Sequence, residues 1–426
     1  MLKLQSYPEK TPVSTYRHRF NYLACFIDAV GFPFGNCFFS PVTILPAFIR
    51  KLSTNSFWIG LTNAIHSSFF FLPQLLAASW IERMPIKRGY VLTLALIERF
   101  AILALIPQIL LLGRTSPNLS LMLFSLTFAI FMLSMGFNGP AYFDLVAKVI
   151  PVTKRGTMYG TAGAIGGLLS IFGAWLAKYF LAGYEFPINF SLCFLVGFII
   201  LTITVLPLGF IDEPPSSPSQ PKRLRQYVRD AIVILKEDYN FRYYIYSQIF
   251  LSAFGVVLGF LTAYTIDKMI ATESDAPAFT AAMMIGKTIG QPFWGYVADK
   301  RGNQLVILIN TGITCLMILW IVTANSIIIF YGIFALIGFL HSGIDIPSFN
   351  MTMEFSQADN LPTYTALRSS AVAPFRAALP LFSGLIIETD KDRYTHVFLA
   401  CILLLLLSWH SLWKVKEPRY QSPEQT

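Results

Sequence analysis

Residues 295–302 read Gly-Tyr-Val-Ala-Asp-Lys-Arg-Gly. Their last four residues, Asp299 to Gly302, form a charged hairpin between two long apolar runs, in a chain where polar residues are scarce. A short basic loop between two such runs is typical of neighbouring helices that cross a membrane. A fainter copy of the pattern lies at Gln74 to Arg88. The two copies together indicate a duplicated membrane protein.

The composition indicates that lipid is the solvent for most of this chain. Its 426 residues are 55% apolar and only 13% charged, whereas a soluble domain carries roughly 25% charged residues. The apolar runs are about 18 to 25 residues long, which is enough for a helix to span a hydrocarbon core about 30 Å thick. They are continuously apolar, whereas the strands of a membrane barrel alternate. We therefore expect an all-α polytopic membrane protein.

About twelve membrane-spanning helices are predicted. They lie near residues 22–48, 56–80, 89–112, 119–147, 157–182, 188–211, 243–267, 277–298, 303–324, 326–350, 363–387 and 395–413.

The net charge of +9 is distributed as the positive-inside rule describes. When the spans are counted from the N-terminus, the basic clusters fall on one side of the membrane, and acidic residues dilute those on the other side. This bias places both termini in the cytoplasm, and it argues against nucleic acid as a partner. We expect a multi-pass protein of the plasma membrane with lipid around it, acting as a monomer.

The residue pattern does not favour an enzyme. The five cysteines lie inside predicted spans without the paired spacing of a metal site, so we interpret them as small packing residues. No nucleophile constellation and no phosphate-binding loop stand out in the sequence. We therefore expect no metal, no cofactor and no direct use of ATP.

The chain divides into two halves of six spans. Residues 212–221, Asp-Glu-Pro-Pro-Ser-Ser-Pro-Ser-Gln-Pro, have the composition of an exposed linker, and a short interfacial helix is expected from Leu224 to Leu235. The predicted units are an N-terminal segment 1–21, a bundle 22–211, a linker 212–241, a bundle 242–413 and a tail 414–426. Gln74 and Gln291 each lie eight residues before an acidic-basic pair, Glu82-Arg83 and Asp299-Lys300. Such internal repeats occur in many transporter folds.

The pattern Gly295-x-x-x-Asp299-Lys300-x-Gly302 resembles the loop signature between the eighth and ninth helices of the major facilitator superfamily. The family has one more basic residue where this chain has Asn303, and the copy around Glu82 is more degenerate. The resemblance covers nearly the whole chain. It implies two six-helix bundles around a central cavity that opens alternately to each side.

We interpret the two loops as a conformational latch formed by Gly295, Asp299, Lys300, Arg301 and Gly302, with Glu82 and Arg83 as its partner copy. Gly295 would let a neighbouring helix approach closely. Asp299 would accept hydrogen bonds from a helix N-terminus, and the two basic residues would reach a carboxylate of the other bundle. Such contacts would exist only while the cytoplasmic side is closed. The alternative is a tight turn that only anchors the loop.

Two cations inside predicted spans are candidates for a substrate cavity. Lys287 lies twelve residues before Asp299, which is about 18 Å into the membrane at helical rise, and Arg376 lies in the middle of the eleventh span. Charges at this depth are costly unless they are paired or hydrated. Either they bind an anionic group of a substrate, or each is paired with a buried carboxylate that it neutralises. Gln74 and Gln291 complete the candidate set.

Three residues are candidates for proton coupling. Asp28 lies in the first span, where removal from water favours the protonated form that a proton carrier needs. His341 and Asp345 are four residues apart in the tenth span, a spacing that lets an imidazole meet a carboxylate. The alternative for each is a hydrogen-bonded structural residue.

Two further charged pairs are expected to be structural. Glu98 and Arg99 are adjacent, and since adjacent residues do not face each other on a helix, each is expected to have another partner. Asp144 and Lys148 are expected to form a simple pair between successive turns.

The sequence thus predicts a secondary-active transporter of a small organic solute that works by alternating access with proton coupling. An uncoupled facilitator is the nearest alternative. A membrane assembly factor or receptor with the same fold is the alternative from another class, and the charges inside the spans argue against it.

Overall fold

The structure, a computed structural model, describes residues 15–81, 84–215, 229, 233–355, 361–390 and 393–418. The N-terminal half contains α1 (Thr15–Asn36), η1 (Cys37–Phe39), α2 (Ile44–Leu52), α3 (Phe57–Ile81), α4 (Arg88–Leu112), α5 (Pro117–Val149), α6 (Val152–Gly183), α7 (Ile188–Val205) and η2 (Leu206–Phe210). The C-terminal half contains α9 (Tyr239–Leu251), α10 (Ala253–Asp267), η3 (Glu273–Asp275), α11 (Ala276–Arg301), α12 (Asn303–Thr323), α13 (Ile327–Phe355), α14 (Leu361–Thr389) and α15 (Arg393–Trp413).

Each of the twelve predicted spans corresponds to a helix or to two consecutive helices, which confirms the all-α prediction. Among the described residues, ten such units are long and apolar enough to cross a membrane. Helices α3 and α11 are not among the ten, although they have 25 and 26 residues. They carry His66 and Lys287, and both pack against the opposite half of the molecule.

The first span is not the single helix that the sequence predicted over 22–48. It is broken at Ser40, whose backbone is extended (φ −51°, ψ 123°), and it continues as α2. The residue before a proline is disfavoured in the helical region, and Pro41 follows Ser40. The seventh span is likewise divided, at Ser252, into α9 and α10.

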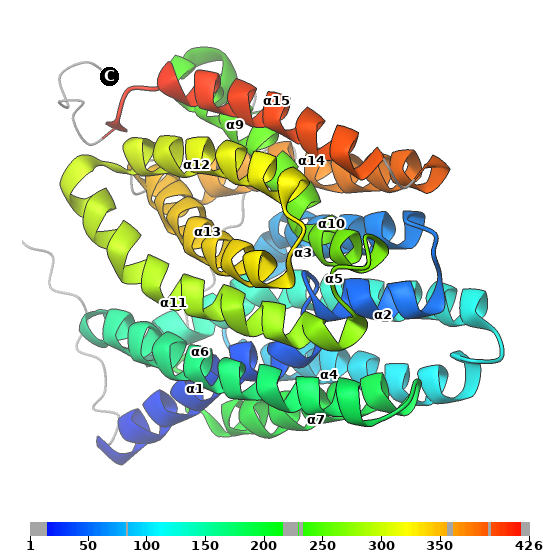
Figure 1. The fold of residues 1–426 in the computed structure, drawn as a ribbon. Coiled ribbons are helices and arrows are strands. Elements are labelled where there is room, and N and C mark those ends of the chain that lie inside the picture. The colour runs from blue at the N-terminus through cyan, green and yellow to red at the C-terminus, as the bar shows by residue number, and fades with distance from the viewer. Residues whose placement is uncertain are drawn as a thin grey trace, which may run out of the picture.

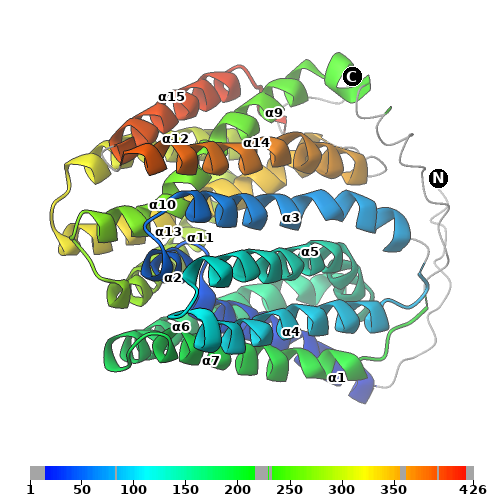
Figure 2. The same cartoon turned by 90° about the vertical axis from the view of Figure 1, so that its right-hand side faces the viewer.

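The helices form two bundles that lie side by side (Figure 1). Helices α1 to α7 pack mainly on one another, as do α9 to α15, and the principal contacts between the halves are α3 with α14 and α6 with α11. Helix α1 begins and α15 ends at the same end of the molecule, here named the terminal side (Figures 1 and 2). The other end is named the opposite side. The predicted helix from Leu224 to Leu235 and most of the linker and N-terminal segment lie outside the described residues.

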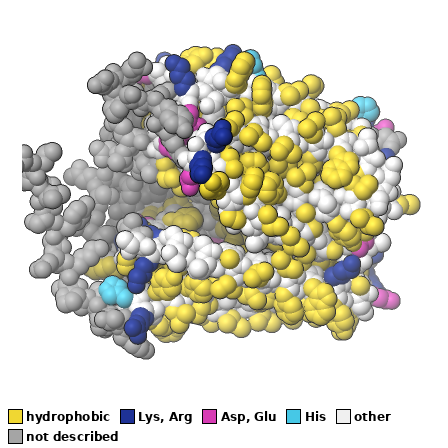
Figure 3. Space-filling model, turned by 60° about the vertical axis from the view of Figure 1, so that its left-hand side comes forward, with side chains coloured by type: hydrophobic (Ala, Val, Ile, Leu, Met, Phe, Trp, Pro, Cys, Tyr) yellow, Lys and Arg dark blue, Asp and Glu magenta, His cyan; other side chains and the backbone are white. Residues whose placement is uncertain are grey.

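Hydrophobic side chains cover the middle of the face seen in Figure 3, and charged ones gather toward its two ends. Large apolar residues are widely exposed; Phe210 and Ile328, for example, are 75% and 76% exposed. Apolar exposure on this scale suits a surface surrounded by lipid. The five cysteines, in contrast, are all buried and unpaired, as the packing interpretation predicted.

Helices α11 and α13 make the closest contact inside the C-terminal bundle. A Cβ added to Gly338 would lie 1.9 Å from the carbonyl oxygen of Met283, and one added to Gly286 would lie 1.8 Å from that of Ala335. Small residues allow such backbone approach in membranes. This contact holds Lys287 of α11 beside the polar face of α13.

Candidate functional site: a gated central cavity

The opposite side is closed by a buried ion pair between the two bundles. Arg50 of α2 lies 2.9 Å from Asp267 of α10, and their side chains are 2% and 8% exposed. The Tyr394 hydroxyl of α15 accepts a hydrogen bond from Arg50 at 2.6 Å and donates one to Asp267 at 2.9 Å. Ser56 also accepts from Arg50, at 2.6 Å. A charge-assisted network this well buried is strong only while the halves remain together.

Further contacts cross between the halves around this pair. The backbone N–H of Ser56 donates to Glu388 at 2.7 Å, the hydroxyl of Thr262 donates to the carbonyl of Val42 at 2.9 Å, and the hydroxyls of Thr43 and Thr280 are hydrogen bonded. Two longer ion pairs, Lys51–Glu273 and Lys178–Asp275, both span 3.7 Å. We name Arg50, Asp267 and Tyr394 the gate triad.

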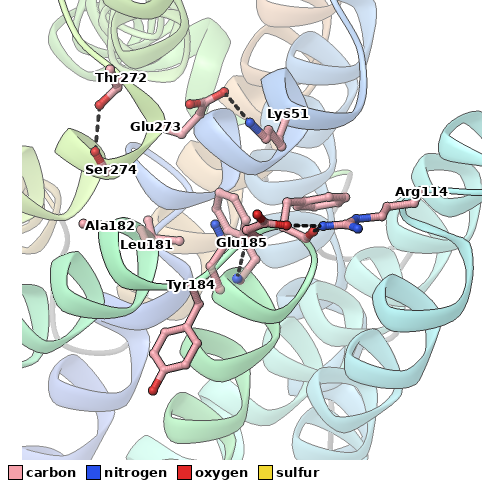
Figure 4. Close-up of a pocket in the computed structure, with 12 residues that line it drawn as sticks. Lys51, Arg114, Leu181, Ala182, Tyr184, Glu185, Thr272, Glu273 and Ser274 are labelled. Carbon is pink, nitrogen blue, oxygen red and sulfur yellow. Dashed lines mark hydrogen bonds and ion pairs between the residues drawn. The ribbon is translucent and has the colours of Figure 1, made fainter.

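A polar pocket of about 600 Å³ lies on the opposite side, outside the gate triad (Figure 4). The Lys51–Glu273 pair lies on one part of its wall, and Arg114 contacts Glu185 at 3.1 Å on another part. The side chains of Arg114 and Glu185 are 61% and 89% exposed. The pocket is therefore a solvated vestibule.

Among the residues that the structure describes, the terminal side is open. Helices α6 and α11 meet near Gly167, where an added Cβ would lie 3.2 Å from the hydroxyl of Thr288. Toward the terminal side they diverge, and a Cβ added at Gly160, Gly163 or Gly295 would meet nothing within 4 Å. Figure 1 shows the two helices separating in this direction, and Figure 3 shows a hollow between the halves.

The described part of the predicted latch makes no contact with the other bundle. The close helix contact expected at Gly295 is not made by any described residue, and a Cβ added there would meet nothing within 4 Å. Asp299, Lys300 and Arg301 are exposed, and Lys300 lies over the ring of Tyr296 on its own helix, 4.4 Å from its centroid. The latch was expected to engage only when this side is closed, so its role stays a prediction. Glu82 and Arg83 lie outside the described residues.

One glutamate in each half holds the loop that contains, or corresponds to, the predicted latch. Neither glutamate was singled out from the sequence. Glu213 accepts hydrogen bonds from the backbone N–H groups of Lys87 and Arg88, both at 2.7 Å, at the start of α4. Glu417 accepts from those of Asn303 and Gln304, at 3.3 and 2.8 Å, at the start of α12. A carboxylate is favoured at a helix N-terminus. Each glutamate precedes a proline after the last helix of its half, a repeat that could have identified them.

Gly302 is the one position of the latch where glycine is needed for its backbone conformation. Its φ is +93°, in the region that favours glycine. A Cβ added at Gly302 would lie only 2.6 Å from a carboxylate oxygen of Glu417. The turn between α11 and α12 therefore depends on this residue.

The C-terminal bundle brings the predicted cavity residues together. His341 and Asp345 form the expected pair, with 2.8 Å between Nδ1 and Oδ2. Lys287 and Arg376 lie close enough to Asp345 to interact with its charge. Asp345 is 56% exposed although it lies mid-way along α13, inside a predicted span. Its side chain is therefore accessible rather than packed inside the bundle.

Helix α3 of the N-terminal bundle faces this cluster. The guanidinium of Arg376 lies over the ring of Phe71, 4.5 Å from its centroid, and His66 lies within electrostatic range of Arg376 and His341. Gln74 instead donates to the carbonyl of Phe70 in its own helix at 3.0 Å, and Gln291 is exposed. The roles proposed for the two glutamines stay predictions.

A second set of charges lines a recess within the N-terminal bundle. The recess measures about 330 Å³, and Asp28, Glu98, Arg99, Asn138 and Tyr142 are on its wall. Asp28, which is 7% exposed, is hydrogen bonded to Tyr142 and lies within electrostatic range of Arg99. The candidate for proton coupling is thus buried beside a cation, away from His341 and Asp345.

The premise that Glu98 and Arg99 do not meet was wrong, because Arg99 Nη1 lies 2.5 Å from Glu98 Oε2, with both side chains buried. Each also has the further partner that was expected. Glu98 accepts from Asn138 at 3.1 Å, and Arg99 donates to the carbonyl of Leu201 at 3.4 Å.

Asp144 and Lys148 form the predicted pair at 3.6 Å, but it is not a simple one. Lys148 lies closer to Glu213, at 2.8 Å, and Asp144 pairs with Lys87, the residue just before α4. These charges therefore join the terminal ends of α4, α5 and the segment after α7.

The fold and this arrangement define a polytopic helical membrane protein with two bundles and a cavity open at one end. Residues 249–426 match the model of the Major Facilitator Superfamily, and over most of its length the chain has the fold of solved members of that superfamily, which confirms the fold that the resemblance implied. Among curated protein sequences, none matches.

Solved structures agree over nearly the full length. A D-xylose-proton symporter superposes with a TM-score of 0.72 at 13% identity, covering 94% of this chain and 99% of its own. A Major Facilitator Superfamily transporter, FucP, in its outward conformation has a TM-score of 0.61 at 13% identity, covering 94% and 99%. At these identities the likeness concerns the fold.

A bacterial homologue of the iron transporter ferroportin is available in two states. Its inward-facing form has a TM-score of 0.70 at 14% identity, covering 95% of this chain and 99% of its own. Its outward-facing form has a TM-score of 0.60 at 17% identity, covering 93% and 98%. The likeness in fold is therefore greater to the inward-facing form.

Proposed function

We propose that the chain is a secondary-active transporter that moves a small organic solute by alternating access. The observation that carries this proposal is the gate triad. It joins the two bundles through a buried ion pair at one end, while the bundles are apart at the other end. A contact that can form in only one of two arrangements biases a two-state equilibrium. We infer that the protein alternates between this state and one in which the latch closes the terminal side.

The cavity between the bundles is the proposed substrate site. Lys287 and Arg376 supply two positive charges, and Asp345, which is paired with His341, supplies one negative charge. The excess of positive charge suits a substrate that carries an anionic group. Asp28, His341 and Asp345 are the proposed carriers of a coupled proton, because carboxylate and imidazole groups change charge when they bind one.

A flux assay tests this proposal. The purified protein in liposomes would be offered organic anions, sugars and amphipathic drugs, with and without an imposed pH gradient. We expect uptake of at least one solute that rises with the gradient. Flux indifferent to pH would favour the uncoupled facilitator, and absence of flux for every solute would favour a non-transporting assembly factor or receptor.

The proposed setting is the plasma membrane, with both termini in the cytoplasm and the protein acting as a monomer. The basic residues at the terminal side support this orientation. Reporter fusions at residue 426 and within the loop between α2 and α3 would test it, because the two reporters should respond on different sides of the membrane. Light scattering of the purified protein would test the monomer.

A further inference from the structure

The recess in the N-terminal bundle has the properties of a binding site for a positively charged group. Its wall is mainly apolar, with contributions from α1, α3, α4, α5, α6 and α7. Arg99 is held against Glu98 at 2.5 Å, so these two charges offset each other. When the carboxylate of Asp28 is ionised, the recess therefore carries one net negative charge. A buried charge of this kind is costly unless a partner arrives.

An aromatic pair joins this recess to the cationic wall of the other bundle. Phe70 lines the recess, and its ring lies 4.8 Å from that of Phe71. The Phe71 ring in turn lies 4.5 Å from the guanidinium of Arg376. Two aromatic contacts of less than 5 Å therefore link the wall of the recess to a positive charge.

The guanidinium is able to receive an anionic group. Asp345 is the carboxylate whose charge acts on Arg376. It is already paired with His341, at 2.8 Å. Lys287 adds a second positive charge in the same region. Guanidinium groups bind carboxylates through paired N–H donors.

We propose that the substrate is a zwitterion whose two charges are separated by an apolar spacer. Its ammonium group binds at Asp28, its carboxylate binds at Arg376, and its spacer lies along Phe70 and Phe71. This inference rests on the proposed transport function, and it names the substrate class. One molecule then satisfies the buried charge of Asp28 and the half-buried charge of Arg376 at once and bridges the two bundles, which neither a simple amine nor a simple acid does.

Three matched compounds test the inference: ε-aminocaproate, hexylamine and caproate, which differ only in their charged ends. Calorimetric titration of the purified full chain should show the zwitterion binding at least about tenfold more tightly than either analogue, since each added charge pair contributes on the order of one decade in Kd. A shorter and a longer ω-amino acid, γ-aminobutyrate and ω-aminocaprylate, extend the series to other charge separations.

Variants assign each end of the ligand. Asp28→Asn should remove the advantage of ε-aminocaproate over caproate, and Arg376→Gln should remove its advantage over hexylamine. The conservative Asp28→Glu and Arg376→Lys variants should each retain part of the preference, which guards against a variant that merely misfolds. Arg114→Gln, an exposed charge on the vestibule, is the control and should leave the ranking unchanged.

The inference is overturned if no zwitterion in the series binds, if the analogues bind as tightly, or if both variants weaken all three compounds equally. Its failure is distinguishable from failure of the proposed function. Flux of another solute without binding of these zwitterions refutes only the substrate class. Binding of a zwitterion without flux of any solute refutes transport.

Discussion

The gate triad permits a quantitative prediction about the equilibrium between states. Asp267→Asn preserves the shape of the side chain and removes its charge, leaving Arg50 buried with neutral partners. Removing one partner of a buried pair costs about 3–5 kcal/mol. Because three neutral acceptors remain, the carbonyl of Thr54 and the hydroxyls of Ser56 and Tyr394, we expect about 2–3 kcal/mol here. The loss applies only to the state with the opposite side closed, so it shifts the equilibrium roughly 30- to 150-fold toward the other state.

A cysteine introduced at Thr280 reports this shift. Thr280 is fully buried at the contact between the bundles, so Thr280→Cys should react slowly with a water-soluble maleimide. Adding Asp267→Asn should accelerate the reaction roughly 30- to 150-fold. The five native cysteines are buried and should not contribute. Glu185→Gln is the control, because its pair with Arg114 is exposed and lies within one bundle. Equal rates in Asp267→Asn and Glu185→Gln would refute the reasoning.

Three other predictions concern coupling, packing and the latch. His341→Gln should abolish accumulation driven by a pH gradient while preserving exchange of substrate at equal pH; loss of both would indicate a structural role. Gly338→Ala should lower the thermal unfolding midpoint by an amount equivalent to about 1–3 kcal/mol, because the added methyl group overpacks against Met283. Gly332→Ala is the control and should leave the midpoint unchanged, since its added methyl group meets open space. Similar midpoints for the two variants would contradict the packing. Asp299→Asn should slow cycling between states more than Glu82→Gln in a transport assay; comparable effects would show that the two loops are not ranked in this order.

Local sequence patterns accounted for the helices and for contacts along one helix. The continuous apolar runs located every span, because lipid requires each span to satisfy its own backbone hydrogen bonds. The pair of His341 and Asp345 followed from their spacing. The break at Ser40 was missed, although Pro41 was a signal for it.

Contacts between distant segments could not be predicted in this way. Arg50 was not singled out as a functional residue from the sequence, because its partners Asp267 and Tyr394 belong to the other bundle and no periodicity links them. Glu213 was assigned to an exposed linker, whereas its carboxylate holds the start of α4. In both cases the pairing depends on how the folded bundles are placed.

Alternating access is tested most directly by following both ends of the molecule at once. Reactivity would be measured for Thr280→Cys at the opposite side and, in a separate protein, for Gly163→Cys at the open terminal side, each with and without Asp267→Asn. The account predicts opposite changes: faster labelling at position 280 and slower labelling at position 163. Faster labelling at both positions, or a change at 280 with none at 163, would contradict alternating access.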